Sequence, residues 1–86
     1  MPEISRFYGI VIKIYFADHL PPHLHAEYGT EEALLNIETL AVIAGKLPTR
    51  AISLIREWAS LHREELRAAW DKARNLESPG KIAPLP

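Results

Sequence analysis

Three histidines and two carboxylates lie within ten consecutive residues in the first third of the chain. The segment reads DHLPPHLHAE and runs from Asp18 to Glu27. If it continues into a β-strand from residue 23, the two-residue period places His23, His25 and Glu27 on one face, with neighbouring side chains about 6 to 7 Å apart. Two imidazoles and a carboxylate at this spacing could hold a divalent metal such as zinc.

Catalysis without a metal is a second interpretation of the same residues. His19, His23 and His25 could supply a general base and a general acid for nuclease-type cleavage of a phosphodiester. The residues expected to contact such a substrate are basic or aromatic: Arg6, Lys13 and Tyr28. A third interpretation is that the polar residues only form the solvated face of an edge strand. The sequence leaves these three alternatives open.

The residues from 4 to 45 carry the pattern of short β-strands. The stretch from Ile4 to Phe16 is dense in β-branched and aromatic residues and is interrupted at Gly9, which indicates two strand segments. Two consecutive prolines, residues 21 and 22, require a loop before the histidine strand. Gly29 and Thr30 then predict a hairpin turn, and a last short strand is expected to end at Gly45. We therefore expect an antiparallel meander of four to five short strands.

The residues from 48 to 75 have the pattern of one long C-terminal amphipathic helix. Apolar side chains recur on a single stripe, and His62 lies near the centre of that stripe, where we expect a core histidine. A helix of 26 residues would be about 39 Å long, whereas a six-residue strand spans about 20 Å. The helix must therefore overhang the sheet or break, and the surplus apolar stripe needs cover from the tail at 76–86 or from a partner.

Length and composition favour one small α+β domain over residues 1–86. The chain has 86 residues, is 48% hydrophobic and carries a formal net charge of −1, so no global charge attracts nucleic acid. Cysteine is absent, which removes thiolate ligands and nucleophiles and suits a reducing compartment. No apolar run reaches the roughly 20 residues that a membrane span needs, and we expect a cytoplasmic protein. A chain this small buries only about 60% of its surface, so a homodimer is a reasonable expectation.

The chain resembles the bacterial family catalogued as domain of unknown function 4160. The resemblance rests on the N-terminal stretch MPEISRFYGIVIKIYFADHLPPHLHAEYG, on LPTRAISLIREWASLHREEL and on the closing KIAPL. The signature Asp-His-x-Pro-Pro-His-x-His-x-x-Tyr begins at Asp18 and ends at Tyr28. Members are often encoded beside a small protein of the domain of unknown function 2442 family. The resemblance therefore implies a toxin-like component of a toxin–antitoxin module, which could act on RNA, with that small protein as its cognate partner. A noncatalytic binding or antitoxin-like module is the alternative.

Overall fold

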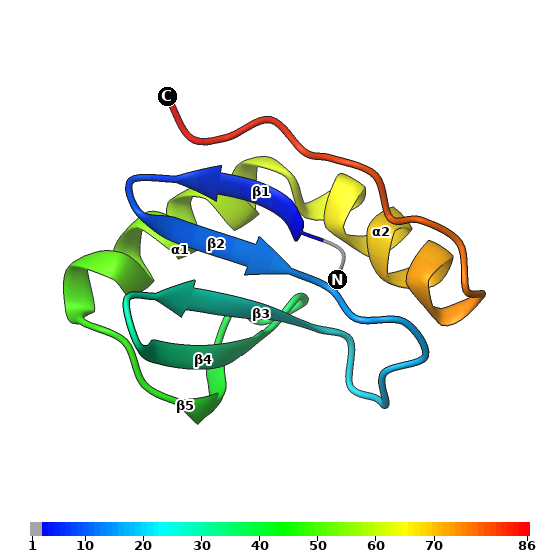
Figure 1. Cartoon of the computed structure of the whole chain (residues 1–86), viewed down its shortest axis with the longest axis horizontal. Coiled ribbons are helices and arrows are strands. Elements are labelled where there is room, and N and C mark those ends of the chain that lie inside the picture. The colour runs from blue at the N-terminus through cyan, green and yellow to red at the C-terminus, as the bar shows by residue number, and fades with distance from the viewer. Residues whose placement is uncertain (1–2) are drawn as a thin grey trace.

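The computed structural model describes residues 3–86 and shows an antiparallel sheet followed by two helices. The five strands follow one another across the sheet in chain order (Figure 1). They are β1 (Glu3–Phe7), β2 (Ile10–Lys13), β3 (His23–Tyr28), β4 (Glu31–Asn36) and β5 (Val42–Gly45). The helices are α1 (Thr49–Leu61) and α2 (Arg63–Arg74). The expected α+β meander is confirmed, and no helix within residues 3–86 combines the length and apolarity needed to cross a membrane.

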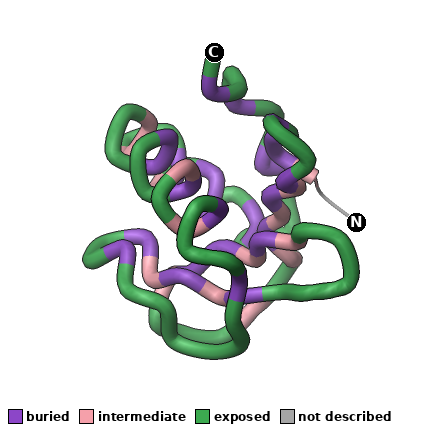
Figure 2. The backbone as a smooth tube through the Cα atoms, turned by 90° about the vertical axis from the view of Figure 1, so that its left-hand side faces the viewer, coloured by how far each residue is buried: buried purple, intermediate pink, exposed green. Residues whose placement is uncertain are grey.

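The helices cover one face of the sheet, and the core lies between these two layers (Figures 1 and 2). Alternate strand residues point into this layer and are fully buried: Ile10, Ile12, Leu24, Ala26, Ala33 and Leu35. From the helices, Ile55 and Trp58 complete the core with no exposed surface. The intervening residues, among them Lys13 and His25, therefore lie on the opposite face of the sheet.

The single long helix predicted from the sequence is wrong, because the chain breaks at His62. This residue has φ −124° and ψ 29°, outside the helical range, and separates α1 from α2. Glu64 and Glu65 follow in the first turn of α2, where negative charge stabilises a helix N-terminus. His62 is not a core histidine either, since it is only partly buried, with 17% of its side chain exposed, and its Nδ1 lies 2.6 Å from a carboxylate oxygen of Glu65. Beyond the break, α2 packs against the loop between β2 and β3, where the N–H of Ala17 donates to the carbonyl of Ala73 and Trp70 is buried.

The C-terminal tail covers the outer edge of the sheet at β1. The backbone N–H of Ile82 donates to the carbonyl of Ile4 at 2.8 Å, and the side chains of Ile82 and Leu85 are buried. The indole N–H of Trp58 donates to the carbonyl of Ala83 at 2.8 Å. The tail therefore covers part of the apolar face of the helices, as the sequence predicted. The other edge, β5, has all four residues exposed.

Gly45 closes β5 in a conformation that no other residue fits. Its φ is +72°, and an added Cβ would lie 2.2 Å from the carbonyl oxygen of Glu32. We predict that Gly45→Ala lowers the free energy of unfolding by at least about 2 kcal/mol, since a left-handed backbone alone costs about 1 to 2 kcal/mol for a non-glycine residue. Chemical denaturation measures the loss.

Gly29 provides the matched control for this substitution. It has φ +63° with no atom within 4 Å of an added Cβ, so Gly29→Ala should cost only the backbone term of about 1 kcal/mol. Equal losses for the two variants would show that the contact with Glu32 is not what requires glycine at position 45.

Candidate metal centre

The loop between β2 and β3 is fixed at both ends before it delivers the histidines. The backbone N–H of Ala17 donates to the carbonyl of Ala73 in α2 at 3.1 Å, and the N–H of Ile37 donates to the carbonyl of Pro22 at 3.0 Å. The ring of His23, at the start of β3, lies 5.2 Å from the ring of Trp70 in α2, measured between centroids. Helix α2 and the end of the sheet therefore hold the loop residues against β3.

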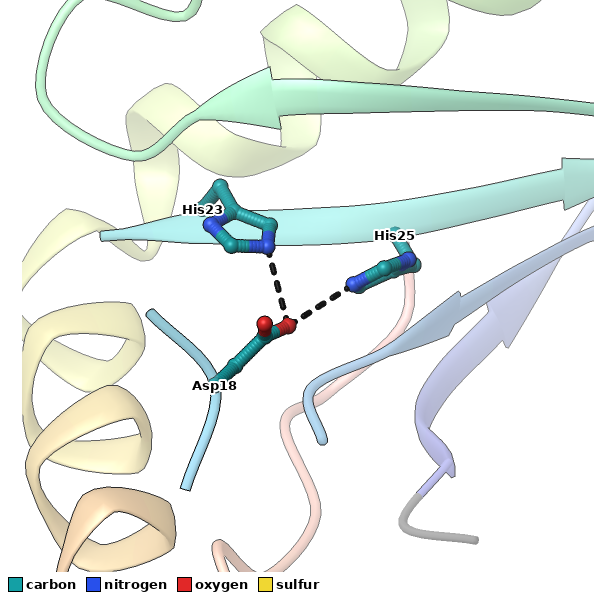
Figure 3. Close-up of side chains that lie close together, drawn as sticks. All are labelled: Asp18, His23 and His25. Atoms are coloured by element: carbon teal, nitrogen blue, oxygen red, sulfur yellow. Dashed lines mark hydrogen bonds and ion pairs between the residues drawn. The ribbon is translucent and has the colours of Figure 1, made fainter. Parts of the chain in front are cut away.

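Asp18, His23 and His25 converge on one point at this end of the sheet (Figure 3). The Oδ2 atom of Asp18 lies 2.9 Å from Nε2 of His23 and 3.1 Å from Nε2 of His25. One ligand atom from each of the three residues lies within 4.8 Å of the other two. The three side chains are largely buried: 15% of the Asp18 side chain, 4% of His23 and 14% of His25 is exposed. They form a small polar centre that solvent still reaches.

The second nitrogen of each ring has its own acceptor. Nδ1 of His23 lies 2.7 Å from the carbonyl oxygen of Pro21, and Nδ1 of His25 lies 3.3 Å from Oε2 of Glu32. A carbonyl oxygen only accepts, so Nδ1 of His23 must carry a proton and donate it. A neutral His23 would then direct the lone pair of Nε2 at the carboxylate of Asp18. A proton or a metal ion between these atoms would satisfy the lone pairs that face each other.

Two of the three ligand separations are close to those of a tetrahedral metal site, and the third lies within 4.8 Å. Nitrogen and oxygen ligands lie about 2.0 to 2.1 Å from tetrahedral zinc, which places ligand atoms about 3.3 Å apart. The observed separations of 2.9 and 3.1 Å from Oδ2 to the two Nε2 atoms need to widen by only a few tenths of an ångström. Metal-bound histidines ordinarily donate their other N–H to a carbonyl or carboxylate. Pro21 and Glu32 occupy these outer positions.

Asp18 is kept in its charged form at this centre. Burial acts to raise the pKa of its carboxyl, but the hydrogen bond from His25, the backbone N–H of His19 and the nearby histidine charges outweigh it and lower the pKa below its ordinary value. The His19 N–H donates to Oδ1 at 3.0 Å. This bond leaves Oδ2, the oxygen that faces both rings, as the ligand atom.

The structure brings together only part of the predicted site. His23 and His25 are in the centre, whereas Glu27 points to Lys13, with 3.0 Å between its Oε2 and the Lys13 Nζ. Arg6, the other expected phosphate ligand, pairs with Glu3 at 2.8 Å. Each of the two expected cations therefore already has a carboxylate partner.

Two further candidates from the sequence lie outside the centre. Tyr28 lines a separate hollow of about 400 Å³ together with Tyr8, Arg50 and Leu54. His19 is adjacent to Asp18, but 93% of its side chain is exposed. Neither residue contributes an atom to the convergent set.

Sequence reasoning left out Asp18 as a ligand and Glu32 as an outer hydrogen-bond partner of His25. Asp18 comes from the loop, so no strand period relates it to His25. Glu32 could have been found, because a two-residue turn at Gly29 and Thr30 places Glu27 opposite Glu32. Glu32 then lies diagonal to His25 on the same face, within reach of a long side chain.

Comparison with known proteins places the chain in a family. Residues 9–71, well over half of the chain, match the family described as Domain of unknown function (DUF4160). The chain belongs to that family. The matched range includes Asp18, His23, His25 and Glu32 and most of both helices, and it leaves out β1 and the tail. No curated protein and no solved structure matches the chain significantly.

Proposed function

We propose that this DUF4160 protein binds one divalent transition metal through Asp18, His23 and His25, and that zinc is the ion to test first. The observation that carries the proposal is the convergence of three ligand atoms whose outer hydrogen-bond partners already have the arrangement of a metal site. Two imidazoles and one carboxylate are ligands suited to zinc and its neighbours among the first-row metals.

Three protein ligands leave a tetrahedral ion with one open position. Structural zinc sites are closed by four protein ligands, whereas catalytic sites keep a position for water or substrate. Among residues 3–86, the convergent group contains no fourth His, Asp or Glu. The proposed site is therefore of the open type.

Metal content and metal-dependent stability test the proposal directly. Untagged protein, stripped with a chelator and reloaded with Zn²⁺, is expected to retain about one ion per chain after desalting. Free Zn²⁺ at about 100 times the dissociation constant should raise the free energy of unfolding by about 2.7 kcal/mol. Retention of less than about a tenth of an equivalent, with no stabilisation by Zn²⁺, Co²⁺, Ni²⁺ or Fe²⁺, would remove the proposal.

Acid provides a second control on the same preparation. Imidazole coordinates only when it is neutral, so the bound ion should be lost as the pH is lowered from about 7.5 to about 5. Binding through surface carboxylates alone would persist at the lower pH.

A further inference from the structure

The hollow that Tyr28 lines lies at the opposite end of β3 from the metal centre. His23 begins β3 and belongs to the centre, whereas Tyr28 is the last residue of the strand. The volume of the hollow is about 400 Å³, near the lower end of the range of about 300 to 1,000 Å³ that small-molecule sites occupy. The hollow is therefore large enough to hold one small molecule that does not contact the metal centre.

Three segments that are distant in the sequence form the hollow. They are the turn between β1 and β2, the adjacent ends of β2 and β3, and the first turns of α1. Ile10 and Ala51 are buried and lie at its base, whereas Tyr8 and Tyr28 expose 58% and 40% of their surface and lie at its rim. An apolar base below an aromatic rim is typical of a pocket for a ligand with an apolar body.

The turn between β1 and β2 positions both tyrosine rings. Tyr8 has φ +50° and Gly9 has φ +81°, and hairpin turns of this kind favour asparagine followed by glycine. A tyrosine at the first position is unfavourable for the backbone and therefore indicates a role for its side chain, whose hydroxyl donates to the carbonyl of Pro86. An added Cβ at Gly9 would lie 3.2 Å from Cε1 of Tyr28, so the Tyr28 ring lies close against the backbone of the same turn.

Arg50 is the one charged residue among the described residues that line the hollow. Arg6 and Arg67 pair with carboxylates, whereas Arg50 is exposed and has no carboxylate partner in the part of the chain that the structure describes. The first turn of α1, where Arg50 lies, contains no acidic residue. A guanidinium binds a carboxylate through two parallel hydrogen bonds. One arginine matches the single charge of a carboxylate, whereas a phosphate monoester carries a charge of about −1.5 to −2.

We infer that this hollow binds a small aromatic molecule that carries one carboxylate. The ring of the ligand packs against Tyr28 and the apolar base, and its carboxylate accepts hydrogen bonds from the guanidinium of Arg50. Aromatic pairs gain stability beyond the area that they bury, which favours an aromatic ring over an aliphatic one of the same size. Binding at this site is independent of the metal centre.

Benzoate and two analogues of the same size test the site. Each is titrated into ¹⁵N-labelled protein at constant ionic strength, and the amide chemical shifts are followed by NMR. Benzoate is expected to bind with a dissociation constant of about 10 mM or lower, as for a ligand of this size, with saturable shifts at Tyr28, Arg50 and Ala51. Benzamide lacks the charge and should bind at least about tenfold more weakly. Cyclohexanecarboxylate lacks the aromatic ring and should bind about twofold to tenfold more weakly.

Substitutions in the hollow assign the two contacts. Arg50→Gln should weaken benzoate binding by at least about tenfold, and Arg50→Lys, which keeps the charge, should recover part of this loss. Tyr28→Ala should weaken binding by about twofold to tenfold. Arg74→Gln is the matched control, because Arg74 is an exposed arginine in the last turn of α2, and it should leave binding unchanged. The amide spectra of all four variants should match the wild type outside the substituted region, which shows that they are folded.

Four results would overturn the inference. The first is the absence of saturable shifts at up to about 50 mM benzoate. Equal binding of benzamide would reject the carboxylate as the recognised group, and equal binding of cyclohexanecarboxylate would reject the aromatic ring. Shifts centred on His23 and His25 would place the anion at the metal centre instead, so His25→Ala is expected to leave benzoate binding unchanged.

Discussion

Replacing His25 with alanine is expected to weaken zinc binding by more than about 100-fold, because loss of a direct ligand exceeds the 10- to 100-fold cost of losing an outer partner. His25 contributes Nε2 to the convergent group and contacts both Asp18 and Glu32. Glu32→Gln keeps the ligands but weakens the bond that orients the ring, and it should cost about tenfold. Competition with a chromophoric chelator measures both dissociation constants.

Glu27→Gln is the control that distinguishes the ligand set seen in the structure from the ligand set predicted by strand alternation. The two-residue period places Glu27 beside His25, whereas in the structure its carboxylate pairs with Lys13. We expect zinc affinity within about twofold of the wild type, as for a surface substitution that leaves the ligands untouched. If Glu27→Gln weakened binding as strongly as His25→Ala while Asp18→Asn did not, the site would be the one on the strand face and the loop carboxylate would be irrelevant.

Trp58→Ala is expected to remove about 3 to 5 kcal/mol of stability, the usual cost of deleting a buried tryptophan. Trp58 has no exposed surface, lies 5.3 Å from the ring of Phe7 between centroids, and donates its N–H to Ala83 in the tail. A domain of this length has a total stability of only about 4 to 13 kcal/mol. The variant should therefore populate the unfolded state visibly in a urea titration.

Trp58→Phe distinguishes the contribution of the hydrogen bond to Ala83 from the contribution of ring packing to stability. It keeps most of the ring but leaves the carbonyl of Ala83 without its donor, so we expect a loss of about 1 to 3 kcal/mol and faster tryptic cleavage at Lys81 as the tail loosens. Leu61→Ala, on the exposed face of the same helix, should change stability by less than about 0.5 kcal/mol. Unchanged cleavage at Lys81 in Trp58→Phe would mean that other contacts hold the tail.

The strand region could be predicted well because its signals are local. Glycine at positions 9 and 29 and the two prolines at 21 and 22 mark the turns, and alternation identifies Leu24 and Ala26 as core residues, which are fully buried. Tyr28 continues the same alternation, yet 40% of its surface is exposed. Tyr28 is the last residue of β3 and lines an open hollow together with Arg50 and Leu54 of α1, which leaves part of its ring exposed.

The helix break was harder to predict because no proline or glycine marks it. Every residue from 49 to 74 tolerates helix, and the apolar stripe continues through His62. The break accompanies tertiary packing, because Leu66 and Trp70 in α2 are both buried. The acidic pair Glu64 and Glu65 was the available signal, since charges of this sign favour a helix start.

The site could be predicted as a histidine cluster but not as a ligand set. His23 and His25 follow from the strand, whereas the contribution of Asp18 depends on how the loop folds against α2, which involves residues more than fifty positions away. The toxin-like role and the small cognate partner stay predictions that rest on the resemblance, and the nucleic-acid target stays a prediction that also rests on the histidine cluster.

The tail along β1 has a consequence for how copies of this chain could assemble. Open sheets tend to recruit further strands at their free edges, and a sheet with two such edges can grow without limit into a filament. Within residues 3–86, the tail around Ile82 lies along the β1 edge, which leaves β5 as the exposed edge that can accept a strand. If two copies pair through β5, the exposed edge of each copy is used. Assembly by this route must then stop at a dimer.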